Sequence, residues 1–201
     1  MSNTDCRKLN FKKMILKVYG YGHPVLTKEA EDIDKDYPDL QGLIDNMFET
    51  MYASDGVGIA APQVGLGIRL FVLDTIQIME EDDKDKGIKK AFINADIIEE
   101  EGKKWSYEEG CLSIPTVTGD VSRQPRIRIQ YYDRDFKFHD EWFDGINARV
   151  IQHEYDHVDG ILFTEYLGPI KRRRIKKTLE KIKTGNIDVE YQMKFFAPKK
   201  R

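Results

Sequence analysis

The 201-residue sequence contains only two cysteines, Cys6 and Cys111, too few for a disulfide framework in a chain of this length. No apolar run approaches the ~20 residues needed to span a bilayer, and the first apolar stretch, Met14 to Val18, is too short for a signal-peptide core. Neither sign of charge dominates, because 32 basic side chains face 35 acidic ones, and this balance predicts no general affinity for nucleic acid or an anionic membrane. We therefore expect a folded cytoplasmic protein with reduced thiols and no membrane contact.

Three helices are predicted from apolar spacing and end signals. Apolar residues recur at three- and four-residue steps from Leu40 to Met51, which indicates one buried helix face. A second helix is expected from about Asp144, a good N-cap residue, to Val158, and a third over 170–183. Runs of β-type composition predict antiparallel strands at 68–74, 91–98, 126–132 and 136–143.

The remaining segments carry weaker signals. Residues 1–13 are polar and without a clear period, so we expect a flexible arm followed by a single domain over residues 14–201. The charge-dense segment 80–87 is expected to be a solvated loop. The tail 187–196 has strand-like composition, but its place in the fold cannot be derived from the sequence.

The strongest chemical signal is the pentapeptide His153-Glu154-Tyr155-Asp156-His157 in the second predicted helix. Residues four apart share a helix face, so both imidazoles can bind one metal ion, and Glu154, about 100° around the helix, can reach a metal-bound water. The alternative is a chance match on an exposed helix, with a frequency of ~0.5% for this composition. Ile146 and Val150 continue the histidine stripe and place it on the core-facing side, which favours metal binding.

A catalytic site of this type needs a third protein ligand, which the residues alone leave open. His23 and His139 are isolated in the sequence. Cys111 lies in the segment 109–113 (EGCLS), where, taken by itself, a buried inert thiol is the more common role. The segment 56–63 (GVGIAAPQ) combines glycines with a lone polar Gln63. It is only a weak candidate for a phosphate loop, and an ordinary tight turn is the alternative.

In this order, the segments 56–63, 109–113 and 152–157 (QHEYDH) resemble the three signature motifs of peptide deformylase, and the resemblance extends from about Met14 to Lys183. It implies an α+β fold with the metal helix packed among antiparallel strands. It also implies removal of the N-formyl group from the initiator methionine of nascent polypeptides, and binding of one divalent metal by Cys111, His153 and His157. Fe2+ is the physiological metal that the resemblance favours, and Zn2+, Ni2+ or Co2+ suit the same ligands.

The resemblance also implies a role for each polar residue of the motifs. Glu154 is expected to take a proton from metal-bound water and to pass it to the departing amine. The side-chain amide of Gln63 and the backbone N–H of Leu112 are expected to stabilise the charge on the formyl oxygen. An extended peptide is expected to pair with Val57, Gly58 and Ile59, with Gly110 allowing close approach. The methionine pocket is expected to include Tyr107, Ile146 and Val150 beside His153, while the orientation of Arg149 is open.

Basic residues crowd the predicted helix 170–183, where Glu180 is the single acidic residue. In some family members such a helix contacts ribosomal RNA, and the equally weighted alternative is an amphipathic helix that packs through Ile175, Leu179 and Ile182. We expect a monomer. Two rival functions are a zincin-type peptidase with a downstream acidic ligand such as Glu165, and a non-catalytic binder of N-terminal peptides.

Overall fold

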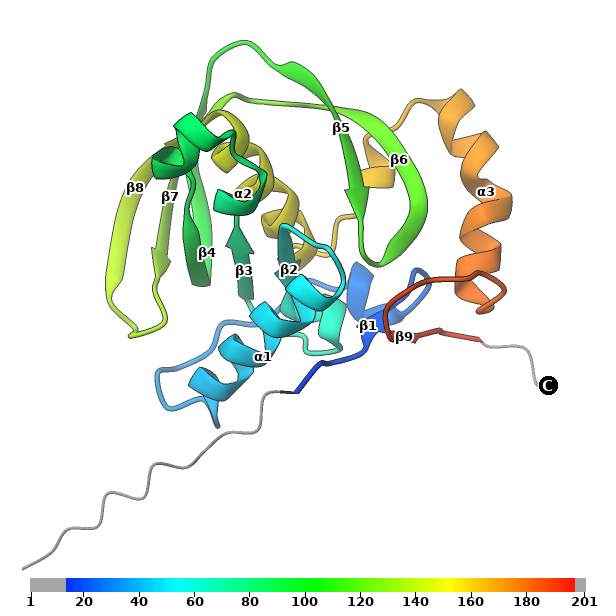
Figure 1. The fold of residues 1–201 in the computed structure, drawn as a ribbon, viewed down its shortest axis with the longest axis horizontal. Coiled ribbons are helices and arrows are strands. Elements are labelled where there is room, and N and C mark those ends of the chain that lie inside the picture. Colours follow the sequence, from blue (N-terminus) through cyan, green and yellow to red (C-terminus); the bar gives the residue numbers. More distant parts are fainter. Residues whose placement is uncertain (1–13, 198–201) are drawn as a thin grey trace, which may run out of the picture.

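The computed structural model describes residues 14–197, and the predicted arm, residues 1–13, lies outside the described residues. A five-stranded antiparallel sheet with the strand order β2-β3-β4-β7-β8 forms the centre of the fold (Figure 1). Its strands are β2 (Gly58–Ala60), β3 (Leu70–Asp74), β4 (Lys89–Glu101), β7 (Arg126–Tyr132) and β8 (Phe138–Asp144). Together with the helices below, this arrangement confirms the predicted α+β class.

Two smaller strand pairs lie beside the central sheet. Strands β5 (Trp105–Cys111) and β6 (Ile114–Arg123) form an antiparallel hairpin, and β1 (Val18–Tyr19) pairs in parallel with β9 (Met193–Lys194). Figure 1 shows β1 and β9 near the end of the hairpin where β5 turns into β6. Segments that lie far apart in the sequence therefore meet at this turn.

Helix α1 (Leu40–Ala53) covers β2 and β3 with the face that the apolar spacing predicts. Ile44, Met47 and Met51 are completely buried in one core cluster with residues of both strands. Burial of each such side chain stabilises the fold by about 2 kcal/mol. This helix thus fixes β2, the edge strand of the sheet.

Helix α2 (Gly145–Val158) contacts the central sheet through Ala148, Ile151 and Val158, and its opposite side faces the β5–β6 hairpin. Asp144 occupies the expected N-cap position, but it makes no capping hydrogen bond, and its carboxylate lies 3.3 Å from Arg126 Nε. Because α2 is enclosed on two sides, its polar residues are buried and need partners.

Helix α3 (Pro169–Lys183) packs against β6, with Ile175 and Ile182 buried and Leu179 partly buried. This agrees with the predicted apolar face of helix 170–183. Five short 3-10 helices complete the described elements: η1 (Pro24–Thr27), η2 (Ala61–Val64), η3 (Ile76–Ile78), η4 (Glu81–Lys86) and η5 (Phe163–Glu165). None of the helices between residues 14 and 197 combines the length and apolar character needed to cross a membrane.

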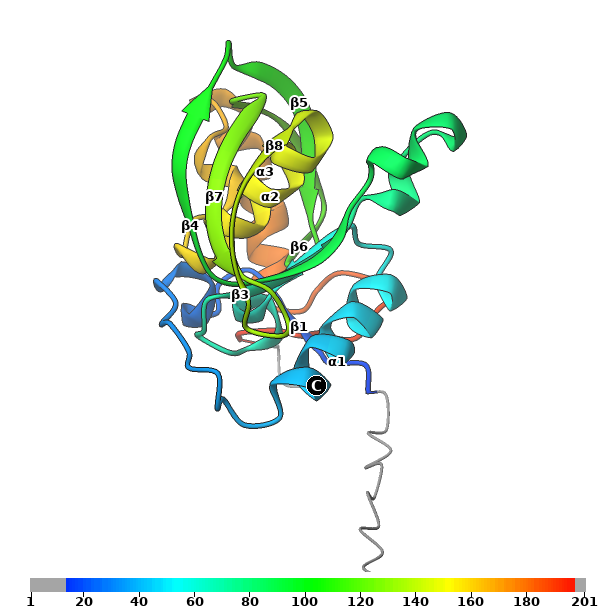
Figure 2. The same cartoon turned by 90° about the vertical axis from the view of Figure 1, so that its left-hand side faces the viewer.

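Several local predictions differ from the structure. The expected loop at 80–87 contains η4, which has no buried residue and projects away from the sheet with η3 (Figure 2). The strand-like tail 187–196 contributes only the two residues of β9. The hairpin β5–β6 was not predicted, because three consecutive residues at 106–108 are exposed and the buried residue that follows them is the carboxylate Glu109.

Candidate active site

The side chains of Cys111, His153 and His157 meet where the end of β5 faces α2. Their ligand atoms all lie within 4.8 Å of one another, and Cys111 Sγ is 3.2 Å from His157 Nε2. Tetrahedral coordination with bonds of about 2.0–2.3 Å separates ligand atoms by about 3.3–3.6 Å, so this set fits one metal ion. The structure thus brings together the three residues that the resemblance implies as metal ligands.

Glu109 orients His153 by binding the ring nitrogen Nδ1. The Nδ1 atom of His153 lies 2.9 Å from Glu109 Oε2, so Nε2 is the ring nitrogen that can serve as a metal ligand. Burial alone would raise the pKa of Glu109, but hydrogen bonds from His153 and Arg123 outweigh it and lower the pKa. Glu109 therefore stays ionised and holds the ring in one orientation.

Two buried arginines complete this network. The Glu109 carboxylate accepts hydrogen bonds from Arg123 Nε at 2.8 Å, Arg123 Nη2 at 3.0 Å and Arg149 Nη1 at 2.9 Å. Arg123 Nη1 also donates to Asp156 Oδ2 at 2.7 Å, and the Asp156 carboxylate accepts the Tyr166 hydroxyl at 3.0 Å. Burial raises the pKa of Asp156, although Arg123 opposes the shift. The side of α2 that faces the hairpin is thus tied to it by charge-assisted hydrogen bonds.

Arg149, whose orientation the sequence left open, faces neither solvent nor the pocket. Its side chain is only 2% exposed, donates to the backbone oxygens of Val121 and Trp105, and lies over the Trp105 ring at 4.5 Å. It is a structural residue that anchors α2 to both strands of the hairpin.

Burial controls the protonation of the remaining polar groups. Burial raises the pKa of Glu154 to about 7, and its Oε2 atom has no hydrogen-bond partner among the described residues. Burial lowers the pKa of His157 well below its ordinary value, which keeps the ring neutral and its lone pair available. Burial would also lower the pKa of His153, but hydrogen bonds with Cys111 and Glu109 outweigh it and raise this pKa.

The close approach of β2 to α2 requires a glycine at position 58. A Cβ atom on Gly58 would lie 2.5 Å from Glu154 Oε1 and 2.7 Å from Glu154 Cδ, far inside van der Waals contact. The strand backbone therefore packs directly against this carboxyl group. This explains the glycine in physical terms, because any other residue would displace Glu154.

Gln63 and Leu112, the two expected oxyanion donors, both lie next to Cys111. Gln63, in η2, accepts the Ala60 N–H at 2.8 Å through Oε1, so its Nε2 points at Cys111 Sγ (3.5 Å) and Ser113 Oγ (3.4 Å). Leu112 is the first residue of the turn between Cys111 and Ile114, which pair with each other. The lone polar residue of segment 56–63 thus has a defined orientation beside the metal-ligand set.

A pocket of about 330 Å³ brings these groups together. Its lining includes the expected ligand Cys111 and the expected proton acceptor Glu154. The two expected oxyanion donors, Gln63 and Leu112, and the strand glycine Gly58 also line it. Val57, Gly110 and Val150, all expected at the substrate, also line it. Within residues 14–197, β2 pairs only with β3, so its other edge is open to an added strand.

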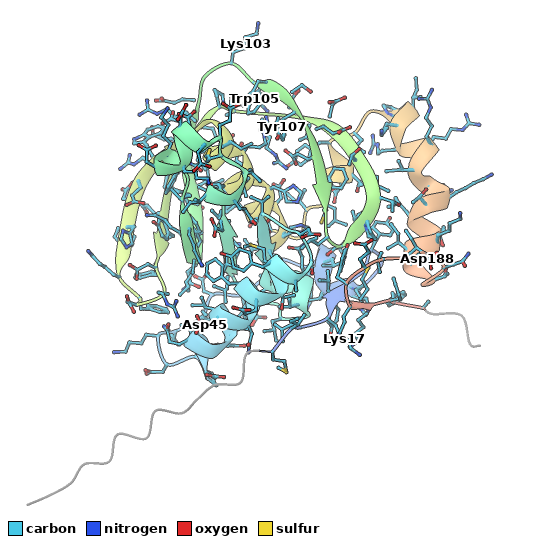
Figure 3. The ribbon with its side chains drawn as sticks, viewed as in Figure 1. Lys17, Asp45, Lys103, Trp105, Tyr107 and Asp188 are labelled. Carbon is cyan, nitrogen blue, oxygen red and sulfur yellow. The ribbon has the colours of Figure 1, made fainter. Side chains whose placement is uncertain are left out.

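Three expected substrate residues lie elsewhere. Ile59 is fully buried in the core, so only its backbone is available to a peptide. Tyr107 is 42% exposed and lies beside Trp105 in the upper part of β5 (Figure 3). Ile146 is partly buried, and neither it nor Tyr107 lines the pocket. Their contact with substrate stays a prediction.

The sequence analysis assigns no role to Glu109, although this residue begins the segment 109–113. Alternate residues of a strand point to the same side, so a carboxylate two positions before Cys111 must face the same helix as the thiol. This signal becomes readable only once residues 105–111 are known to form a strand, which the sequence analysis does not predict. The partners Arg123 and Asp156 gave no comparable local signal, because they lie 33 residues apart in the chain.

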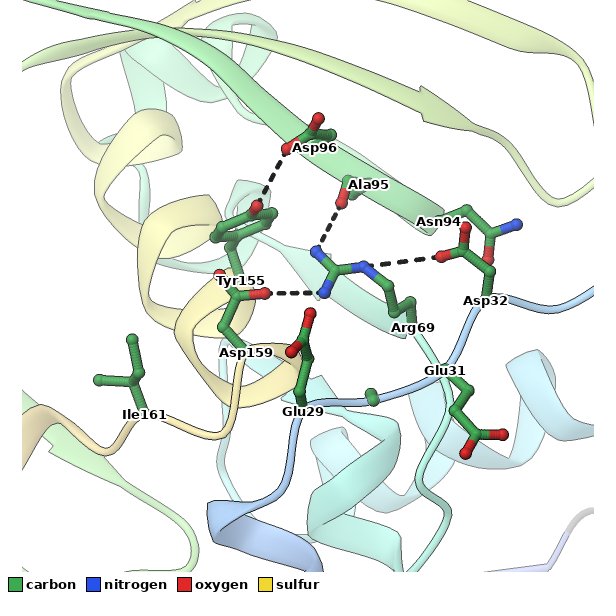
Figure 4. A pocket seen from close by; sticks show the side chains of 11 residues that line it. Glu29, Glu31, Asp32, Arg69, Asn94, Ala95, Asp96, Tyr155, Asp159 and Ile161 are labelled. Carbon is green, nitrogen blue, oxygen red and sulfur yellow. Dashed lines mark hydrogen bonds and ion pairs between the residues drawn. The ribbon is translucent and has the colours of Figure 1, made fainter.

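A second and larger hollow, of about 800 Å³, lies on the side of α2 where Tyr155 and Asp159 project (Figure 4). Arg69 lies in it and binds Asp159 Oδ1 at 2.7 Å and the Ala95 backbone oxygen at 2.9 Å. The described residues that line it include no cysteine or histidine. We therefore assign the chemistry to the smaller pocket.

Comparisons with known proteins show the family to which the chain belongs. The family model for polypeptide deformylase matches residues 15–173. The peptide deformylases of Christiangramia forsetii and Flavobacterium johnsoniae are 52% and 53% identical over 194 residues, which cover 93% of this chain and 99% of each relative. A crystal structure of a peptide deformylase from Legionella pneumophila has a TM-score of 0.75 at 35% identity, covering 86% of this chain and 98% of that one. A plant peptide deformylase structure has a TM-score of 0.77 at 31% identity, covering 87% and 92%. The chain belongs to the polypeptide deformylase family.

Proposed function

We propose that this hydrolase removes the N-formyl group from the initiator methionine of nascent polypeptides, with one divalent metal held by Cys111, His153 and His157. The observation that carries the proposal is the convergence of this ligand set with Glu154 and Gln63 beside the open edge of β2. The bound metal supplies a Lewis acid that makes water nucleophilic at neutral pH. A thiolate with two imidazoles suits Fe2+, which we propose as the physiological ion, as well as Zn2+, Ni2+ and Co2+.

Glu154 moves the proton in this scheme. Its carboxylate accepts a proton as the water oxygen bonds to the formyl carbon, and it returns that proton to the amine nitrogen when the C–N bond breaks. The products are formate and a free N-terminal amine. Glu154 Oε2 has no partner among residues 14–197, so no neighbour competes for the proton.

Gln63 Nε2 and the Leu112 N–H stabilise the negative charge that develops on the formyl oxygen. One donor of this kind is typically worth about 3 kcal/mol, or about a hundredfold in rate. The hydrogen bond from the Ala60 N–H to Gln63 Oε1 supports the assignment, because it leaves the amide nitrogen of Gln63 directed to the site. The donor is therefore oriented before substrate binds.

Recognition rests on the peptide backbone and on one apolar pocket. An extended peptide adds to the open edge of β2 at Val57, Gly58 and Ile59, which supplies hydrogen bonds that do not depend on sequence. Gly110 leaves room for its backbone, since a Cβ there would meet nothing closer than 3.6 Å. The methionine side chain enters the part of the pocket lined by Val150, with Tyr107 and Ile146 as further predicted contacts.

Hydrolysis of formyl-Met-peptide and acetyl-Met-peptide, each with and without a chelator, tests this function. We expect cleavage of the formyl substrate only, and its loss on chelation. Glu154→Ala should retain the metal while losing about a hundredfold or more in turnover. Equal cleavage of both substrates, or full turnover by the metal-loaded variant, contradicts the proposal.

The peptidase alternative finds little support in the structure. Glu165, its candidate downstream ligand, accepts the Leu162 N–H at 3.2 Å and lies outside the metal-ligand set of the described residues. Replacement of Cys111 by Ser separates the two functions. A deformylase should lose metal or activity, whereas a peptidase that uses Glu165 should be almost unaffected.

A ribosome contact through helix 170–183 is the second part of the proposal, with the enzyme acting as a monomer. No basic side chain of α3 forms an ion pair with a residue in the described range 14–197, so these cations are available to a polyanion. Co-sedimentation with ribosomes at increasing salt tests the contact, because binding through phosphates weakens as salt rises. Salt-insensitive binding, or none, contradicts it.

A further inference from the structure

Tyr191 connects the C-terminal tail to the active-site turn. It lies beyond residues 15–173, which the family model matches, and its hydroxyl donates to the Leu112 backbone oxygen at 2.7 Å. The hydroxyl therefore reaches the residue whose N–H we assign to the formyl oxygen. Its ring packs against the cluster that also contains the Leu112 side chain.

The two ends of the described chain hold consecutive carbonyl groups of this turn. The Tyr21 N–H donates to the Ser113 backbone oxygen at 2.9 Å, next to the Leu112 oxygen that Tyr191 holds. Leu112 and Ser113 lie between Cys111 and Ile114, which pair with each other, so they need partners from outside the hairpin.

The tail itself is anchored near this turn. Strand β9 pairs with β1 through hydrogen bonds from the Val18 N–H to Gln192 O (2.9 Å) and from the Gly20 N–H to Lys194 O (3.0 Å). Lys194 Nζ also donates to the Tyr19 hydroxyl at 2.8 Å. Because Tyr191 is next to Gln192, this ladder fixes where the tyrosine can reach. Figure 1 shows the tail running beneath the hairpin turn beside β1.

We propose that Tyr191 is a positioning residue for catalysis, whose hydroxyl holds Leu112 so that its backbone N–H faces the formyl oxygen. The inference rests on the proposed role of Leu112. A carbonyl held at a fixed place restricts rotation of the residue that carries it, and a displacement of about 1 Å at a reacting group can lower a rate by about a hundredfold. Since only one of two oxyanion donors is affected, we expect a smaller fall of about tenfold.

Tyr191→Phe removes the hydroxyl and keeps the ring in the core cluster. We expect kcat for formyl-Met-peptide to fall about tenfold, while KM and metal content stay within about twofold, because the donor acts mainly on the transition state. Tyr131→Phe is the matched control. Tyr131 is 1% exposed and donates to Glu141 Oε2 at 2.8 Å, away from the pocket, so its loss should lower stability and leave kcat unchanged.

Gln63→Ala separates failure of this inference from failure of the proposed oxyanion site. If Gln63→Ala lowers kcat and Tyr191→Phe leaves it within twofold, Tyr191 is not a positioning residue and the oxyanion site stands. If neither variant lowers kcat, both assignments are wrong. A fall for Tyr191→Phe alone supports the Tyr191–Leu112 link and removes Gln63 from the site. An equal fall for Tyr131→Phe overturns the inference, because any buried hydroxyl would then have the same effect.

Discussion

Replacement of Glu109 by Gln should weaken metal binding although Glu109 is not itself a proposed metal ligand. The carboxylate accepts four hydrogen bonds, two from Arg123 and one each from Arg149 and His153. An amide nitrogen at either oxygen position faces N–H donors, so at least one hydrogen bond is lost. Arg149 then loses its carboxylate partner among the described residues, and Arg123 keeps only Asp156. Breaking a buried ion pair on one side costs about 3–5 kcal/mol of stability, and loss of a partner behind a ligating histidine costs about 10–100-fold in metal affinity.

Competition with a chelator for Zn2+ measures the affinity, and urea unfolding with saturating metal measures the stability. Asp156→Asn is the control, because Asp156 binds the same Arg123 at 2.7 Å but forms no hydrogen bond or ion pair with His153 among the described residues. We expect both variants to lose stability. Only Glu109→Gln should lose metal affinity by the stated factor.

Two results would refute this reasoning. Unchanged zinc affinity in Glu109→Gln would show that the carboxylate does not orient His153. An equal loss of affinity in Asp156→Asn would show that general loosening of α2 against the hairpin, and not the bond to the imidazole, controls the metal site.

Three further predictions address other parts of the fold. Gly58→Ala should displace Glu154 and lower kcat by about 10–100-fold with full metal content, whereas Gly67→Ala, where an added Cβ meets nothing within 4 Å, should leave kcat unchanged. Glu141 has a lowered pKa, because hydrogen bonds from Lys90 and Tyr131 outweigh the opposing effect of burial. Its contribution to stability should therefore be present above the ordinary value of 4.5 and be lost as pH falls toward the folded-state pKa, so Glu141→Gln should flatten the acid limb of the urea midpoint against pH. Cys111→Ser should abolish zinc retention at chelator concentrations that the unchanged protein withstands, and retained zinc would exclude the thiol as a ligand.

Local patterns predicted the helices well and the sheets less completely. The helix expected over 170–183 runs over Pro169–Lys183, because an apolar stripe and an initial proline are properties of consecutive residues. The strand at 126–132 was located at its observed bounds by its alternating apolar residues. The β5–β6 hairpin escaped prediction because β5 turns a buried carboxylate, Glu109, toward buried arginines instead of presenting an apolar face.

The candidate site likewise contains some residues that local sequence patterns predict and others that only the tertiary structure brings together. His153 and His157 are four residues apart on one helix, so their shared face follows from helix geometry. Cys111 lies 46 residues from His157 along the chain, and no local rule connects them. The resemblance to a family supplied that link, and the tertiary structure brings the thiol to the imidazoles. Arg149 could not be oriented from sequence, since it lies on α2 and its partners lie on β5 and β6.

The two glutamates of the site lie in different electrostatic environments, which shift their pKa values in opposite directions and suit them to different roles. Glu109 meets two guanidinium groups and an imidazole, and its pKa is lowered in spite of burial. Burial raises the pKa of Glu154 to about 7, and its Oε2 atom has no partner among the described residues. A carboxylate that is always ionised suits the orientation of a ligand, and one that changes protonation near neutral pH suits proton transfer. A glutamate can therefore serve either purpose, because Arg123 on β6 and Arg149 on α2 donate to Glu109 and not to Glu154.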